Sequence, residues 1–152
     1  MDRETRANML AQEVIALAQS TLMVHIRFLD RGLAALKPTP HDKLWFATDG
    51  AHLYYDSWYI LGKYKWEQNA ICRALLHSLL HCVFRHGFIG KEISHSRWDL
   101  ACDIAVEAAI NDMGKSFLSL RRAEQQVGLV SLLLQELQPP LTAERIYRPL
   151  RL

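Results

Sequence analysis

Apolar side chains return every three or four residues through the first 36 positions of the chain. The residues in the first part of this pattern are Met9, Leu10, Val14, Leu17, Ala18, Leu22 and Met23. This spacing places them on one side of an α-helix, and a second apolar stripe from Val24 to Leu36 continues it. The pattern predicts a helical region over residues 2–36, capped by Asp2 or Thr5 and ended by the two prolines that follow.

Two short aromatic runs come next and predict a β-hairpin over residues 44–56. The runs are Leu44-Trp45-Phe46-Ala47-Thr48 and His52-Leu53-Tyr54-Tyr55-Asp56. Asp49-Gly50 lies between them, and this dipeptide is typical of a tight hairpin turn because glycine adopts positive φ at no steric cost. We expect Trp58–Leu61 to cover the end of the hairpin and Gly62 to interrupt that run.

The helical period returns in the second half of the chain. It predicts one helix over residues 67–86 and another over residues 97–113, which is ended by Gly114. Further helices are predicted over residues 119–150, with a break at Pro139-Pro140. Helices with one small antiparallel sheet make an α+β protein.

Composition places the chain among ordinary globular proteins, and residues 1–152 have the length of a single domain. Hydrophobic residues make up 50% and charged residues 22%, which excludes a disordered chain. The net charge of +2 favours neither nucleic acid nor a membrane surface. Three cysteines are too few for a disulfide framework, and residues 1–6 lack the apolar stretch of a signal peptide. We therefore expect a cytoplasmic protein.

The residues that could carry chemistry begin with two histidines in the predicted helix 67–86. His77 and His81 are four positions apart, so their imidazoles lie on one face of a helix, where both can reach a single ion. The two zinc-binding histidines of the HExxH motif have the same spacing. Two hydrogen-bonded structural histidines would also have it, so the pair alone does not establish a metal site.

Asp103 is the preferred third ligand, because a catalytic zinc site uses three protein ligands and keeps one position open. The apolar residues around it in the predicted helix 97–113 are Ala101, Ile104, Ala105 and Val106. A carboxylate buried among such residues needs a partner, and a metal ion is one. Glu107, one turn further, is a second candidate. A salt bridge from Asp103 to Arg73 or Arg85 is the alternative without a metal.

His86 is the competing third ligand. It follows His77 by nine positions, and a continuous helix would turn it toward the other side. Metzincins place their third histidine ten positions after the first, with a glycine between them that turns the chain. Phe84 occupies that glycine position here, so His86 is interpreted as a helix-end residue or as one that supports a ligand.

Several sequence blocks resemble a known family. The blocks are Ala47–Gly50 with Leu53–Tyr55, His77–His81 with Arg85-His86, Trp98–Val106, and the closing segment Leu141–Tyr147. In these blocks the chain resembles the zincin-like metallopeptidase domain at the N-terminus of bacterial VWA-like proteins, the predicted metal-dependent peptidases. The resemblance covers about residues 44–150.

The resemblance implies a zincin-like fold, in which the small hairpin packs beside the metal-site helix. It implies a metal held by His77, His81 and Asp103, the same three residues that the spacing favours. Zinc is the expected ion, although imidazole and carboxylate ligands also suit manganese, iron, cobalt and nickel. The family context suggests a VWA-like domain and MoxR-type AAA ATPases as partners.

The motif departs from the zincin pattern at Ser78. The glutamate of HExxH takes a proton from zinc-bound water, and a serine hydroxyl cannot do this near neutral pH. Glu107 is the expected substitute base, with Glu92 or Glu67 as alternatives. Two functions remain open: a zinc-dependent hydrolase of peptide bonds, and a catalytically inactive zincin-fold scaffold that binds a partner protein.

Overall fold

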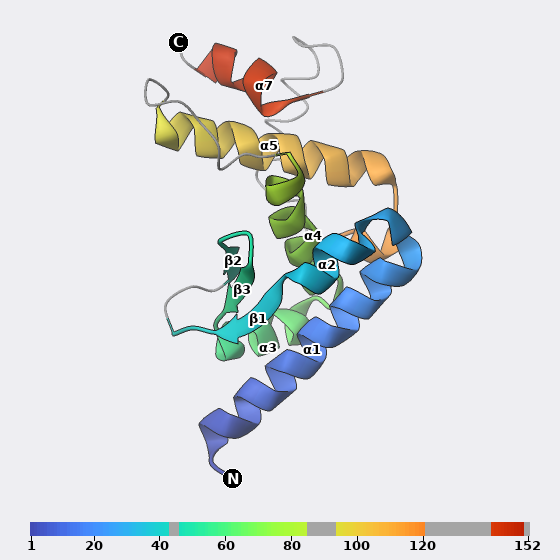
Figure 1. Cartoon of the computed structure of the whole chain (residues 1–152), viewed down its shortest axis with the longest axis vertical. Helices are drawn as coiled ribbons and strands as arrows, with labels where there is room; N and C mark the ends of the chain where they lie inside the picture. Colours follow the sequence, from blue (N-terminus) through green and yellow to red (C-terminus); the bar gives the residue numbers. More distant parts are fainter. Residues whose placement is uncertain (43–45, 85–93, 121–140, 151–152) are drawn as a thin grey trace. The chain divides into compact units, whose positions relative to one another are not determined.

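The computed structural model describes residues 1–42, 46–84, 94–120 and 141–150 (Figure 1). The chain forms two compact units. The first contains residues 1–79 and 117–120, and the second contains the described parts of residues 80–116 and 121–152. Most of the described residues are helical, and a three-stranded sheet lies in the first unit. This arrangement confirms the α+β class.

The first unit begins with the long helix α1, Arg3–His25. Asp2 caps it, because its Oδ1 accepts a hydrogen bond from the backbone N–H of Thr5 at 2.7 Å. Contact with Thr5 also lowers the pKa of the Asp2 carboxyl. The helix ends at Ile26 and is followed by the 3-10 turn η1, Arg27–Leu29, and by α2, Asp30–Ala35. The predicted helical region 2–36 therefore consists of three consecutive helical pieces.

The sheet has the order β1-β3-β2, with β1 at Lys37–Pro40, β2 at Phe46–Thr48 and β3 at His52–Tyr55. β2 and β3 form the antiparallel hairpin, whereas β1 pairs in parallel with β3. The expectation of a purely antiparallel sheet is therefore wrong. The prolines of β1 suggested only the end of a helix, but an edge strand tolerates proline because one of its sides makes no ladder hydrogen bonds.

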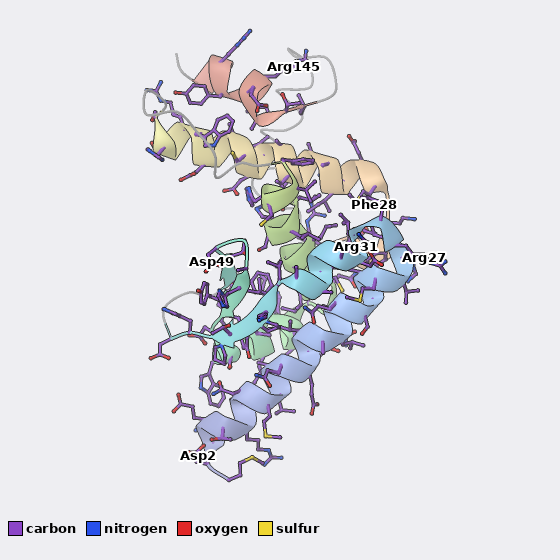
Figure 2. All side chains as sticks on the ribbon, viewed as in Figure 1. Asp2, Arg27, Phe28, Arg31, Asp49 and Arg145 are labelled. Atoms are coloured by element: carbon purple, nitrogen blue, oxygen red, sulfur yellow. The ribbon has the colours of Figure 1, made fainter. Side chains whose placement is uncertain are left out.

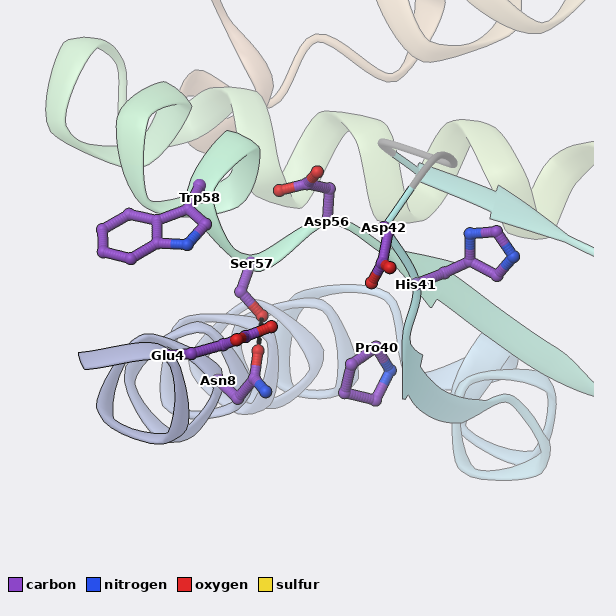
Figure 3. Close-up of a pocket in the computed structure, with 8 residues that line it drawn as sticks. All are labelled: Glu4, Asn8, Pro40, His41, Asp42, Asp56, Ser57 and Trp58. Atoms are coloured by element: carbon purple, nitrogen blue, oxygen red, sulfur yellow. Dashed lines mark hydrogen bonds between the residues drawn. The ribbon is translucent and has the colours of Figure 1, made fainter. Parts of the chain in front are cut away.

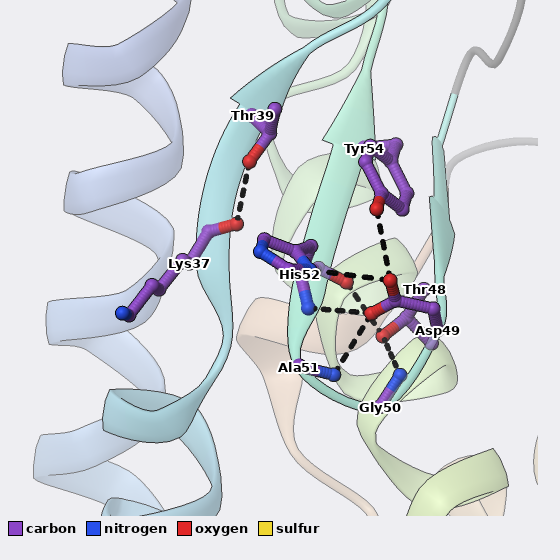
Figure 4. A network of polar contacts seen from close by, with 8 residues as sticks. All are labelled: Lys37, Thr39, Thr48, Asp49, Gly50, Ala51, His52 and Tyr54. Atoms are coloured by element: carbon purple, nitrogen blue, oxygen red, sulfur yellow. Dashed lines mark hydrogen bonds and ion pairs between the residues drawn. The ribbon is translucent and has the colours of Figure 1, made fainter.

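The hairpin turn is organised by Asp49, whose carboxylate accepts four hydrogen bonds (Figure 4). Its Oδ1 accepts the backbone N–H groups of Ala51 at 2.9 Å and His52 at 2.7 Å. Its Oδ2 accepts the Tyr54 hydroxyl at 2.8 Å and lies 3.1 Å from His52 Nδ1. These bonds hold the pKa of Asp49 well below its usual range, and the backbone hydrogen bond from His52 has the largest effect. Gly50 has a φ of 93°, the conformation that the turn requires of it.

Helix α3, Ser57–Trp66, follows the sheet and packs against α1. Asp56 caps it by accepting the backbone N–H of Tyr59 at 3.1 Å. The prediction that Gly62 interrupts this segment is wrong, because the helix passes through it. A glycine inside a helix costs about 1 kcal/mol relative to alanine, and the cap and the burial of Ile60 offset that cost.

The helices that carry the predicted chemistry are α4, Asn69–Val83, and α5, His95–Met113. Gly114 ends α5 in the left-handed conformation, with a φ of 62°, as its position in the sequence predicts. In the second unit α5 packs against α7, Ala143–Leu150. The predicted helical pattern of residues 121–140 lies outside the described residues. In the part of the chain that is described, no helix combines the length and apolar character needed to cross a membrane.

The Asp49 network predicts a pH-dependent contribution to stability. The folded-state pKa of Asp49 is lowered, so this contribution is present above its unfolded pKa of about 3.9 and is lost as the pH falls through the folded value. We expect Asp49→Asn to lower Tm at neutral pH, and we expect the difference from the unmodified chain to shrink below about pH 4. Circular dichroism melts over this range measure it. Asp112→Asn, at another exposed aspartate, is the matched control, and a difference that is constant down to about pH 3 contradicts the prediction.

Candidate metal centre

Helix α4 holds both predicted histidines in place. Its buried residues include Ile71, Leu75, Leu76, Leu79 and Leu80. At the start of the helix the Asn69 amide and the Arg73 guanidinium donate hydrogen bonds to backbone oxygens of Ser119 and Leu118. The helix runs without interruption from Asn69 to Val83. Its geometry therefore places His77 and His81 one turn apart on the same face.

Asp103 lies on a different side of α5 from the core that this helix shares with α7. That core contains Trp98, Ala101, Cys102, Ile104, Ala105, Ala108, Ala143 and Ile146. At about 100° per residue, Asp103 points away from Ala101 and Ala105. Its side chain is 42% exposed. Three of the apolar neighbours named in the sequence analysis, Ala101, Ile104 and Ala105, belong to that core and do not bury the carboxylate of Asp103.

The structure brings together the three residues that the sequence selected as metal ligands. His81 Nε2 lies 3.0 Å from Asp103 Oδ1. One ligand atom each from His77, His81 and Asp103 lies within 4.8 Å of the others, and all three residues are partly buried. Among the described residues this is the group of histidine, cysteine and acidic side chains that could hold a metal ion.

The chemistry of this donor set fits a divalent metal. Imidazole nitrogen and carboxylate oxygen bind zinc at about 2.0–2.2 Å, and two histidines with one carboxylate is a ligand set of catalytic zinc sites. Three donors this close to one another can surround one ion with small side-chain adjustments. The same donors suit other first-row divalent metals.

Cys102 is next to Asp103 in the sequence but points to a different side of the helix, into the core between α5 and α7. Burial first, and then the negative charges of Asp103, Asp99 and Glu144, raise the pKa of its thiol to about 12. The thiol of Cys102 therefore remains protonated at neutral pH and belongs to the core between α5 and α7.

The other predicted catalytic residues are placed as follows. Ser78 and Glu107 are each 7% exposed, on α4 and α5 respectively. Glu107 does not belong to the group of three candidate ligand residues found in the described part of the chain. Glu67 ends α3, where its backbone N–H donates to the oxygen of Lys63. His86, Glu92 and Arg85 lie outside the described residues.

A separate small cavity in the first unit was not predicted from the sequence (Figure 3). It has a volume of about 180 Å³. The residues that line it are Glu4, Asn8, Pro40, His41, Asp42, Asp56, Ser57 and Trp58. They come from three distant segments of the chain, so no local motif reveals them. The Arg3 guanidinium lies 5.1 Å from the centre of the Trp58 ring, which places a cation beside this acidic cavity.

Comparison with protein families identifies the type of domain. The model of a family described as a putative metallopeptidase domain matches residues 5–151. Comparisons with curated proteins and with solved structures found no match.

The raised pKa of Cys102 predicts slow alkylation. With a thiol pKa of about 12, we expect iodoacetamide near pH 8 to modify Cys102 at least about tenfold more slowly in the folded protein than in denaturant, where the pKa returns to about 8.5. Mass spectrometry of the digested protein measures both rates. Equal rates in the folded and denatured protein would contradict the described burial of this thiol.

Proposed function

Because the chain belongs to the putative metallopeptidase domain family over residues 5–151, we propose that it is a metal-binding domain of the peptidase type. The observation that carries the proposal is the convergence of His77, His81 and Asp103 within 4.8 Å. Zinc is the ion that we propose, since two histidines and one carboxylate are ligands of zinc peptidases.

The protein contributes rigidity and charge to this site. His77 and His81 offer two nitrogen donors from one continuous helix, so little conformational freedom is lost when they bind the same ion. Asp103 brings a negative charge that partly neutralises a divalent cation. An ion held there would polarise a substrate carbonyl and lower the pKa of a water molecule toward about 7.

For the reaction we propose peptide-bond hydrolysis in which Glu107 accepts a proton at a carboxylate oxygen. Glu107 lies one turn after Asp103, so both project from the same side of α5. Its side chain is 7% exposed, so its carboxylate is largely shielded from bulk water. Ser78 occupies the place of the zincin glutamate, and its hydroxyl does not accept protons at neutral pH.

The second candidate function is a non-catalytic scaffold with the zincin fold. The observation that favours it is Ser78 itself, because the motif lacks its base. A VWA-like domain and a MoxR-type AAA ATPase are the partners that we propose for this role, on the resemblance of the sequence blocks. If the chain is such a scaffold, we expect its metal site to be filled and the protein not to hydrolyse peptides.

Metal content tests the site directly. We expect about one zinc per chain in protein purified without a histidine tag or chelator, and at least about a tenfold loss of zinc affinity in the double variant His77→Ala/His81→Ala. Elemental analysis and zinc titration measure these values. His25→Ala/His95→Ala removes two histidines that are exposed and lie outside the candidate site, and it serves as the matched control. If no zinc binds even after reconstitution, the metal proposal is wrong.

Hydrolysis of unfolded casein separates the two candidate functions. If the domain is a peptidase, we expect cleavage that disappears on chelation and in His81→Ala, and that falls by about 10²-fold or more in Glu107→Gln, which removes the proposed base. Loss of cleavage with zinc still bound identifies Glu107 as the base rather than a structural residue.

The serine position gives the complementary test. If the zinc-loaded chain does not cleave casein, the peptidase proposal fails and the scaffold is supported. In that case we expect Ser78→Glu to introduce cleavage, because it restores the missing base. Ser78→Gln has the same size without a base and controls for the cost of a larger side chain at this buried position.

A further inference from the structure

Helix α1 carries apolar side chains on its solvent side as well as on its core side. Its core residues are Ala7, Ala11, Ile15, Ala18 and Leu22. On the opposite side Met9 is 49% exposed, Leu10 44%, Leu17 55% and Val24 67%. Figure 2 shows side chains along both sides of this helix. A helix that is apolar on two sides is typical of one that packs against a partner on each of them.

The charged residues of this outer face are few and opposite in sign. Arg6 and Glu13 are both exposed and lie on the same side of α1 as Met9 and Leu10. They are seven positions apart, which is about 10.5 Å along the helix axis and too far for an ion pair within one copy. Neither forms an ion pair with another residue of the described part of the chain.

We propose that this face binds a second copy of the chain, with the two α1 helices antiparallel and a twofold axis between Met9 and Leu10. In a twofold pair, residue i of one copy contacts residue j of the other, and j contacts i. The midpoint of Arg6 and Glu13 falls between Met9 and Leu10. Each Arg6 therefore lies level with Glu13 of the other copy, which gives two equivalent ion pairs on either side of a central apolar contact.

Charge selects this register over the alternatives. A longer overlap centred near Leu17 would carry each Arg6 past the C-terminal end of the other copy's α1 and leave Glu13 level with Ser20, so neither would face an opposite charge. A register centred on Glu13 would place the two Glu13 carboxylates against each other. Like charges in direct opposition are destabilising. The Met9–Leu10 register pairs opposite charges, unlike either alternative.

The same register buries apolar side chains at the two ends of the contact between the helices. It brings Met1, which is 85% exposed, level with the region of Leu17 in the other copy. A contact made by one helical face is smaller than a standard interface of roughly 1,600 Å². We therefore expect micromolar rather than nanomolar self-association.

Charge reversal tests the pairing in the full chain. Sedimentation equilibrium from micromolar to near-millimolar protein measures the dimer constant of each variant. We expect Arg6→Glu and Glu13→Arg each to weaken the dimer by about tenfold or more, because each places two like-charged pairs across the axis. An equimolar mixture of the two variants restores association, since opposite charges then face each other in both pairs of the mixed dimer. The double variant Arg6→Glu/Glu13→Arg restores it for the same reason.

The controls separate this register from other modes of association. Arg27→Glu reverses a charge beyond the proposed overlap, so we expect it to leave the dimer constant unchanged. Far-UV circular dichroism verifies that each variant is folded, and the restored association of the mixture excludes unfolding as the cause of the single-variant defects. A chain that stays monomeric at the highest concentration, or a dimer that neither reversal weakens or that the mixture does not restore, overturns the proposal. None of these readouts involves the metal site.

Discussion

The continuity of α4 from Asn69 to Val83 is the constraint on which the candidate centre depends. Two of its three ligand residues, His77 and His81, are both carried by this helix, whose 3.6-residue turn sets the distance between them. The helix is held by buried leucines, and each such side chain contributes roughly 1.5–3 kcal/mol on burial. The residues that hold α4 in place are therefore different from the candidate ligands His77 and His81.

The parts of the molecule that depend on local spacing could be predicted from the sequence. The histidine pair, the Asp49-Gly50 turn and the glycine cap of α5 each depend on a few neighbouring residues. Strand β1 could not be predicted in this way, because its partner β3 lies more than ten residues further along the chain and its prolines argue against a strand. The prediction that Gly62 interrupts its segment was wrong for a related reason. The burial of Ile60 by tertiary packing outweighs the local cost of a glycine in the helix.

Asp103, the predicted third metal ligand, lies beside His81, but its surroundings differ from those expected from the sequence. The apolar residues around it in the sequence were expected to bury its carboxylate. In the structure Ala101, Ile104 and Ala105 pack in the core shared with α7, and Asp103 remains 42% exposed beside His81. A half-exposed carboxylate gains little stability from an ion pair, so the contact with His81 contributes little to the stability of the fold.

Packing in the core of the first unit does not explain the residues on the outer face of α1. The core side of this helix is filled mainly by alanines, and their small size lets neighbouring elements approach closely. The larger side chains Met9, Leu10 and Leu17 are on the solvent side, where about half of each remains in contact with water. Folding alone would favour the opposite distribution, since large apolar residues gain most from burial. A helix that leaves these large side chains exposed is understandable if its outer face is buried in an assembly, and Arg6 with Glu13 then determines which alignment of two copies buries it.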